Sequence, residues 1–148
     1  MGLFDFLRTT ISHISKFPAD YVVLDIETTG FSRTDDRIIE IAANKYSNGK
    51  LVEQYHSYVN PGISIPIPVI QLTGITNADV KNAPTIKQVK REVIAFLGFR
   101  PLVGHNIIRF DIPFLQKQMN YQFRNQLIDT LTLSQETFQD CLVTSFLF

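Results

Sequence analysis

The chain has almost no cysteine, no tryptophan and no excess charge of either sign, and each shortage excludes a class of protein. The single cysteine, Cys141, excludes a disulfide framework and a zinc ribbon, and it suits a reducing compartment. Fourteen basic residues balance fourteen acidic ones, so no global positive field attracts nucleic acid. A nucleic-acid enzyme of this composition would depend on metal ions and a local basic surface.

Long apolar runs are also lacking. No stretch reaches the roughly 18 apolar residues that a membrane span needs. Charged residues interrupt the first 17 positions, which therefore do not resemble a secretory signal. We expect a soluble, cytoplasmic protein without a membrane partner. Its 148 residues are enough for one domain with a substantial core.

The chain divides into three regions by sequence pattern. Residues 1–18 are predicted to form an amphipathic helix, because apolar residues recur there at helical spacing, at Leu3, Leu7, Ile11 and Ile14. This helix either docks on the domain or contacts a partner or membrane surface. Residues 19–133 are expected to form the domain itself, and residues 134–148 an atypical apolar tail.

Strand and turn signals predict a mixed α/β sheet in which three antiparallel strands precede alternating helices and strands. Asn48–Gly49 is a strong hairpin signal between the second and third strands. The expected strands cover residues 21–27, 37–46, 51–59, 101–104 and 126–130, and the expected helices cover residues 69–72, 85–97 and 111–119.

Two carboxylates interrupt the first, apolar strand. Asp25 and Glu27 are two residues apart, so their side chains point to the same face. Neighbouring acids on a half-buried strand repel each other and are costly to desolvate unless cations neutralise them. The pattern therefore predicts a divalent metal site, with residues 28–30 forming a turn that a substrate backbone can approach. The purely structural alternative is a strand that ends in a solvated acidic loop.

A third carboxylate, Asp111, begins a predicted helix after the sequence Gly104-His105-Asn106. Alone it would be interpreted as a helix N-cap. Together with the acids of the first strand it favours an active site.

Two weaker patterns have mainly structural interpretations. Lys87, Lys90 and Arg91 share the outer part of one predicted helix, and such a stripe either grips phosphates or is simply solvated. His56 in the third strand is expected to have a cross-strand surface role rather than a catalytic one.

The motifs Asp25-Ile-Glu-Thr-Thr-Gly30 and Gly104-His-Asn-x-x-x-Phe-Asp111 resemble those of the DEDD-type (DnaQ-like) 3′–5′ exonucleases. This family includes the proofreading subunits and domains of bacterial replicative DNA polymerases. Supporting segments, in the family's order and spacing, are residues 36–43, 59–61, 72–76 and 128–130. The resemblance covers about residues 20–133 and is highly specific because several motifs occur in order.

The resemblance implies an RNase H-like fold and proofreading or repair chemistry in DNA replication. Asp25, Glu27 and Asp111 would be catalytic and would hold two Mg²⁺ or Mn²⁺ ions. The substrate would be a single-stranded or frayed 3′ end of DNA, with RNA as an alternative, and a DNA polymerase subunit is an implied partner. The implied substrate-binding residues are Ile26, Thr28, Thr29, Gly30, Leu72, Asn106 and Phe110.

The sequence departs from the family after Thr130. The family's third motif, a His followed by an Asp, is absent, since the last histidine is His105. We therefore expect the C-terminal helices to be missing, one ion to be weakly held and the exonuclease activity to be impaired. An exposed apolar surface would then favour oligomers. The alternative is a non-catalytic remnant that binds nucleic acid or a polymerase.

Overall fold

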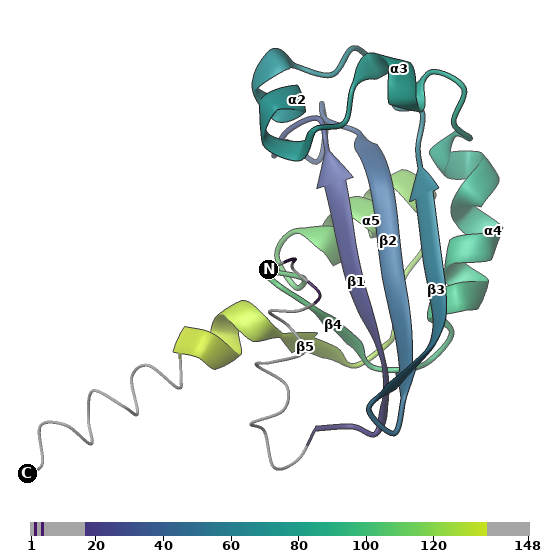
Figure 1. The fold of residues 1–148 in the computed structure, drawn as a ribbon, viewed down its shortest axis with the longest axis vertical. Helices are drawn as coiled ribbons and strands as arrows, with labels where there is room; N and C mark the ends of the chain where they lie inside the picture. The colour runs from purple at the N-terminus through teal and green to yellow at the C-terminus, as the bar shows by residue number, and fades with distance from the viewer. Residues whose placement is uncertain (1, 3, 5–16, 136–148) are drawn as a thin grey trace, which may run out of the picture.

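The computed structural model describes residues 2, 4 and 17–135. These residues form a five-stranded sheet in the order β3-β2-β1-β4-β5 (Figure 1). The predicted N-terminal helix and the apolar tail lie almost entirely outside the described residues. Within the described part, no helix has the length and apolar character to cross a membrane.

Three antiparallel strands form one half of the sheet. They are β1 (Asp20–Thr28), β2 (Ile38–Ser47) and β3 (Lys50–Tyr58). The predicted turn joins β2 to β3, and both Asn48 and Gly49 have positive φ angles, of 50° and 73°. These are the conformations that a tight hairpin requires and that Asn and Gly adopt most readily.

The other half of the sheet is parallel. Strand β4 (Leu102–Gly104) pairs with β1, and β5 (Leu127–Asp129) pairs with β4. The predicted α/β class and mixed sheet are therefore confirmed. The pairing of β4 with β1 is short, because it involves only Val22 and Val23 of β1. Beyond Val23, no residue of β4 is paired with that edge of β1.

Helices α4 (Ile86–Leu97) and α5 (Asp111–Met119) cover one face of the sheet, as Figure 1 shows. The backbone N–H of Thr85 donates to the Gln88 side chain at 2.7 Å, which supports the predicted helix start. Both helices pack on the main core, whose largest fully buried side chains include Phe114, Leu24, Ile41, Leu97 and Leu102.

The opposite face of the sheet carries a smaller apolar cluster. Tyr21 and Tyr46 stack with their ring centroids 5.0 Å apart, and Val23 and Val103 are buried beside them. Phe4 and Phe17 pack against this cluster. Side chains from the N-terminal region therefore cover part of this face, and the expected exposed apolar surface stays a prediction.

Two short helices lie across the end of the sheet at which β1 and β3 finish (Figure 1). Helix α2 (Ile67–Thr73) ends at Gly74, whose φ of 76° is left-handed. Helix α3 (Asn77–Val80) was not predicted, although Thr76 and Asp79 form a reciprocal capping box. A further helix begins at Thr130 and continues to residue 135, where the described part ends.

Candidate active site

The two acids of β1 lie on the face opposite α4 and α5. Ile26 between them is only 4% exposed and belongs to the main core, so Asp25 and Glu27 point the other way. A β-bulge follows directly, since Glu27 pairs with Glu40 of β2 whereas Thr28 pairs with Ile38. Bulges are frequent next to active sites because they reorient side chains.

Asp111 reaches the same strand from the edge with which β4 pairs. Near the start of β1, Val22 donates its N–H to the carbonyl oxygen of Pro101 at 2.9 Å. Four residues later β4 no longer pairs with β1. Here the N–H of Ile26 donates instead to Oδ1 of Asp111 at 3.1 Å. The carboxylate thus takes the place of a neighbouring strand. It is the first residue of α5, and the preceding Phe110, at the N-cap position, makes no side-chain cap.

Burial and mutual repulsion destabilise the ionised forms of all three acids. Burial, then the Glu27 and Glu40 carboxylates, raise the pKa of Asp25 to about 7. Burial, then Asp25, raise the pKa of Asp111 to about 8. Burial and Glu40 raise the pKa of Glu27. The three predicted residues therefore share one electrostatic environment that favours a bound cation.

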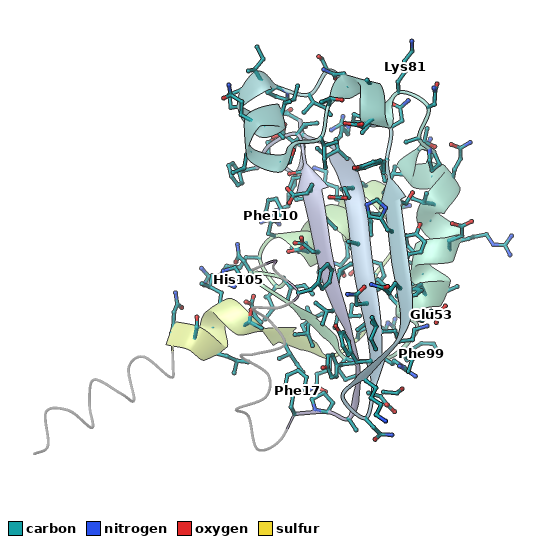
Figure 2. The ribbon with its side chains drawn as sticks, viewed as in Figure 1. Phe17, Glu53, Lys81, Phe99, His105 and Phe110 are labelled. Carbon is teal, nitrogen blue, oxygen red and sulfur yellow. The ribbon has the colours of Figure 1, made fainter. Side chains whose placement is uncertain are left out.

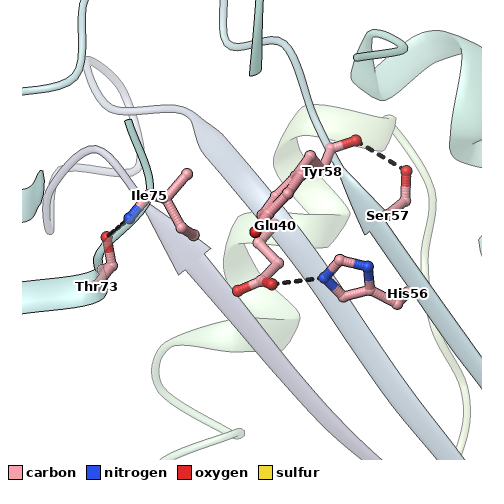
Figure 3. Close-up of polar contacts among 6 residues, drawn as sticks. All are labelled: Glu40, His56, Ser57, Tyr58, Thr73 and Ile75. Atoms are coloured by element: carbon pink, nitrogen blue, oxygen red, sulfur yellow. Dashed lines mark hydrogen bonds and ion pairs between the residues drawn. The ribbon is translucent and has the colours of Figure 1, made fainter. Parts of the chain in front are cut away.

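Glu40 is a fourth acid beside this group. It lies directly across from Glu27 in the β1–β2 register, an arrangement that is unfavourable for like charges. His56 of β3 meets it, with Nε2 of His56 2.6 Å from Oε1 of Glu40 (Figure 3). The predicted cross-strand role of His56 is confirmed. Glu40 is thus paired with His56 of β3, on the side of β2 away from β1.

The turn after β1 is braced from within. Thr29 is 2% exposed, and its hydroxyl donates to Oδ1 of Asp36 at 2.9 Å. Thr28 is also buried, and its hydroxyl donates to the carbonyl oxygen of Gly30 at 2.6 Å. A Cβ on Gly30 would lie 2.5 Å from the Asp36 carboxylate. Packing within the turn therefore favours glycine at position 30. The binding of a substrate by the backbone of these three residues stays a prediction.

The loop between β4 and α5 is fixed by a buried acid. Asp129 accepts hydrogen bonds from the backbone N–H groups of Asn106 at 2.9 Å and Ile108 at 3.2 Å. Asn106 has a φ of 62°. A Cβ on Gly104 would lie 2.9 Å from the carbonyl oxygen of Leu24, so only glycine lets this loop pass so close to β1. These contacts set the position from which Asp111 enters the site.

Exposed apolar side chains occur near the end of β1. Leu72 is 82% exposed on α2, the helix that lies across this end of the sheet. Phe110 lies beside the upper part of β1, whereas His105 lies nearer the helix that begins at Thr130 (Figure 2). The ring of Phe110 contacts that of Phe31, with centroids 6.0 Å apart, and Phe31 is itself 86% exposed. Exposed aromatic faces beside a polar site suit the stacking of bases.

The donor set suits a hard divalent cation, because carboxylate oxygens are the ligands that Mg²⁺ and Mn²⁺ prefer. Among the described residues, however, no three His, Cys, Asp or Glu side chains are already gathered closely enough to hold a metal ion. The hydrogen bond from Ile26 holds Asp111 against β1. The three-ligand set stays a prediction.

Sequence reasoning missed Glu40 and Phe31 as members of the site. Glu40 interrupts the run Ile-Ile-Glu-Ile-Ala just as Asp25 interrupts the first strand, so the signal was present. The β1–β2 register, which the pattern of residue types does not reveal, was needed to bring Glu40 to Glu27. Nothing in the residue pattern marks Phe31 as exposed.

A family model described as an exonuclease (RNase_T) matches residues 22–145. The match extends past residue 133, where the recognisable motifs end. Its range includes all three predicted catalytic acids and the turn that follows β1.

The sequence relatives include DNA polymerase III proteins and a protein named as a 3′-5′ exonuclease. The chain is 39% identical over 131 residues to a PolC-type DNA polymerase III of Clostridium perfringens, covering 86% of this chain and 9% of that protein. It is 37% identical over 122 residues to the DNA polymerase III subunit epsilon of Aquifex aeolicus, covering 80% of this chain and 60% of that protein. The 3′-5′ exonuclease DinG of Bacillus subtilis is 39% identical over 123 residues, which are 80% of this chain and 13% of DinG.

Among solved structures, the fold resembles that of E. coli exonuclease I in complex with single-stranded DNA. The TM-score is 0.72 at 18% identity, over 81% of this chain and 30% of that chain. This likeness confirms the predicted RNase H-like fold. Together with the extent of the family match, it leads to one assignment: the chain belongs to the exonuclease family of DnaQ-like, DEDD-type nucleases.

Proposed function

We propose that this chain is a metal-dependent 3′–5′ exonuclease that removes nucleotides from single-stranded or frayed 3′ ends of DNA, with impaired turnover because the family's third motif is absent. The observation that carries the proposal is the placement of Asp25 and Glu27 on one face of β1, with the Asp111 carboxylate hydrogen-bonded to the N–H of Ile26 between them. Buried carboxylates that repel one another favour a cation, and exposed apolar residues beside them suit the bases of a strand end.

Each part of the chain has a distinct role in this proposal. Asp25, Glu27 and Asp111 would hold the cations by their carboxylates. When bound, a pair of divalent ions supplies an activated water and stabilises the leaving oxygen of the scissile phosphate. Phe31, Phe110 and Leu72 would contact the terminal bases, as would the backbone of residues 28–30. Ile26 is buried in the core and would hold β1 in place under the acids. The Asn106 backbone, bound to Asp129, would hold the loop that carries Asp111.

The names of the relatives indicate where such an activity would be used. The PolC-type polymerase and the epsilon subunit belong to replicative DNA polymerases, and DinG is named as a 3′-5′ exonuclease. We therefore propose DNA as the substrate, a DNA polymerase subunit as a partner and the cytoplasm as the compartment. The chain spans a small part of the polymerases, so these assignments concern the domain alone.

The test is the release of nucleotides from a single strand labelled at its 5′ end, with Mn²⁺ or Mg²⁺. We expect a ladder of products shortened from the 3′ end, and no ladder with a chelator. Asp25→Ala should slow the reaction at least about 100-fold, because a metal contributes several kcal/mol and each about 1.4 kcal/mol is a factor of ten.

Two results would contradict the proposal. A cleavage pattern that starts inside the strand would indicate an endonuclease, and equal rates for the parent and Asp25→Ala would show that the acids are not involved. Metal-dependent binding of the strand without cleavage would instead support the alternative, a non-catalytic domain that binds nucleic acid or a polymerase. An RNA strand of the same sequence decides between the two nucleic acids.

A further inference from the structure

A depression of about 630 Å³ lies between the loop that follows β1 and helix α5. We call it the basic pocket. It is lined mainly by residues with hydrogen-bond donors, namely Arg33, Thr34, Gln116, Lys117, Asn120 and Gln122. No carboxylate is among its lining residues.

The cations of the basic pocket come from separate segments. Lys117 of α5 donates from Nζ to Oγ1 of Thr34 at 3.0 Å, so it bridges the helix and the loop. Arg33 is exposed on the loop itself. At the rim, Nζ of Lys90 on α4 lies 3.5 Å from the carbonyl oxygen of Asn120. Three segments therefore bring positive charge to one place.

The acids nearest in sequence are turned to other partners. Asp35 accepts from the Ser32 hydroxyl at 2.7 Å, and Asp36 accepts from the Thr29 hydroxyl and the Ser32 N–H. Both carboxylates thus brace the loop and keep their negative charge. Neither lines the pocket, so the lining itself carries only cationic and neutral groups.

The basic pocket is built on the same two segments as the candidate active site. Its loop begins directly after Gly30, and Lys117 is six residues after Asp111 on α5, which is about 9 Å along the helix axis. Asp25 and Glu27 point to the other face of the sheet, so an extended strand with its 3′ end at these acids would pass around the end of β1 to reach the pocket, a path of a few nucleotides. An anion bound in the pocket would then be part of that strand.

We infer that the basic pocket binds backbone phosphates of the strand whose 3′ end occupies the acidic site, a few nucleotides upstream of it. This inference rests on the proposed function, because it takes the acids as the place of the strand end. Arg33 and Lys117 would contact the phosphates, since Arg and Lys side chains are the usual phosphate ligands. Lys90 would add to the field at the rim.

The experiment measures the affinity of the full chain for a fluorescent 12-nucleotide single strand in Ca²⁺ or a chelator, over a range of salt concentrations. The test variant is Arg33→Ala/Lys117→Ala. The charge-matched control is Lys50→Ala/Arg124→Ala, which removes one Lys and one Arg from exposed positions outside the pocket. Arg33→Lys/Lys117→Arg keeps the charge and should restore binding.

We expect the test variant to bind roughly tenfold more weakly, and the slope of log affinity against log salt to fall by about 1.4. That is the value for two phosphate contacts on a single strand. The control variant should keep the parent slope. A dinucleotide is too short to reach the pocket, so its binding should be equal in all variants.

Equal slopes for the test and control variants would overturn the inference, as would a parent chain that binds no strand. Competition by an acidic peptide as strong as that by the strand would identify a protein partner and would also overturn it. The two proposals fail separately. A chain that binds through the pocket but never cleaves with Mn²⁺ refutes the enzyme, and a chain that cleaves but loses no affinity in the test variant refutes the pocket.

Discussion

Asp25 is the acid for which metal binding should have the clearest effect on stability. Its raised pKa reflects burial and the nearby Glu27, so its ionised form is destabilising at pH 8 without a cation. We expect Mn²⁺ to raise the melting temperature of the parent chain, because a ligand that binds only the folded state stabilises it. Asp25→Asn should abolish most of this increase and should itself melt higher than the parent in a chelator.

The measurement is thermal unfolding at pH 8 with Mn²⁺ and with EDTA. Asp35→Asn, an exposed acid on the neighbouring loop, serves as the control and should respond to Mn²⁺ like the parent. An unchanged melting temperature of the parent in Mn²⁺ would show that the predicted metal site is wrong.

Asp129 should behave differently, as a structural acid. It is 7% exposed and accepts three backbone N–H groups, those of Asn106, Ile108 and Leu131. Each buried donor left without an acceptor costs about 1–3 kcal/mol. Asp129→Ala should therefore lower the free energy of unfolding by about 3 kcal/mol or more, measured by urea denaturation. Asp35→Ala is the exposed control, and a loss no larger than that of the control would contradict this role.

At the scale of the elements, Gly104 is a position where substitution should be destabilising, because β1 and the chain at the end of β4 pass close together there. A Cβ there would lie 2.9 Å from the Leu24 carbonyl oxygen and from the Ile107 Cβ. Gly104→Ala should cost about 1–3 kcal/mol by overpacking. It should also weaken Mn²⁺ binding, because the displaced loop carries Asp111.

Gly49→Ala is the matched comparison. It is strained by its φ of 73° but has nothing within 4 Å of the added carbon. It should lower stability without any change in Mn²⁺ affinity, as measured by titration calorimetry. If both variants bind Mn²⁺ equally, the loop after β4 does not set the metal site.

Elements with local signals were the ones that sequence could predict. Helix α5 begins at Asp111 and ends at Met119 as expected, because apolar periodicity and flanking residues define it. The helix α3 was missed because it is only four residues long, too short for periodicity to show. Its capping box, Thr76 and Asp79, was the available signal.

For the site, adjacent residues were predictable and long-range relations were not. The pairing of Asp25 with Glu27 follows from strand alternation alone. The approach of Asp111 to Ile26 depends on where β4 stops, which is a property of tertiary packing. The proximity of Glu27 and Glu40 could not be predicted either, because it depends on the register between β1 and β2.

For the whole molecule, the raised pKa values predict that the free energy of unfolding without metal falls as the pH rises. The folded state holds protons on Asp25 and Asp111 up to pKa values of about 7 and 8, whereas the unfolded chain releases them near the ordinary value of 3.8. The folded state therefore binds more protons over this range, and stability falls as pH rises. The stabilising contribution is fully present below about pH 4 and is lost by about pH 8.

Melting temperatures measured in EDTA from pH 5 to pH 8 should thus decline. Asp25→Asn/Asp111→Asn should flatten this decline, and Mn²⁺ at pH 8 should reverse it in the parent. A melting temperature that rises steadily over the same interval would show that these carboxyl groups ionise normally in the folded chain.

The hydrogen bond from Ile26 to Asp111 also bears on how an inactive form of the protein should be made. Asp111 serves as the hydrogen-bonding neighbour that β1 lacks once β4 has ended, so its removal exposes an unpaired backbone donor at a sheet edge. Asp25 also contacts the Ile26 N–H, but it is a residue of β1 itself and does not take the place of a neighbouring strand. A substrate complex trapped for structure determination is therefore better sought with a substitution at Asp25, which spares the scaffold, than with one at Asp111, which would confound loss of chemistry with loss of architecture.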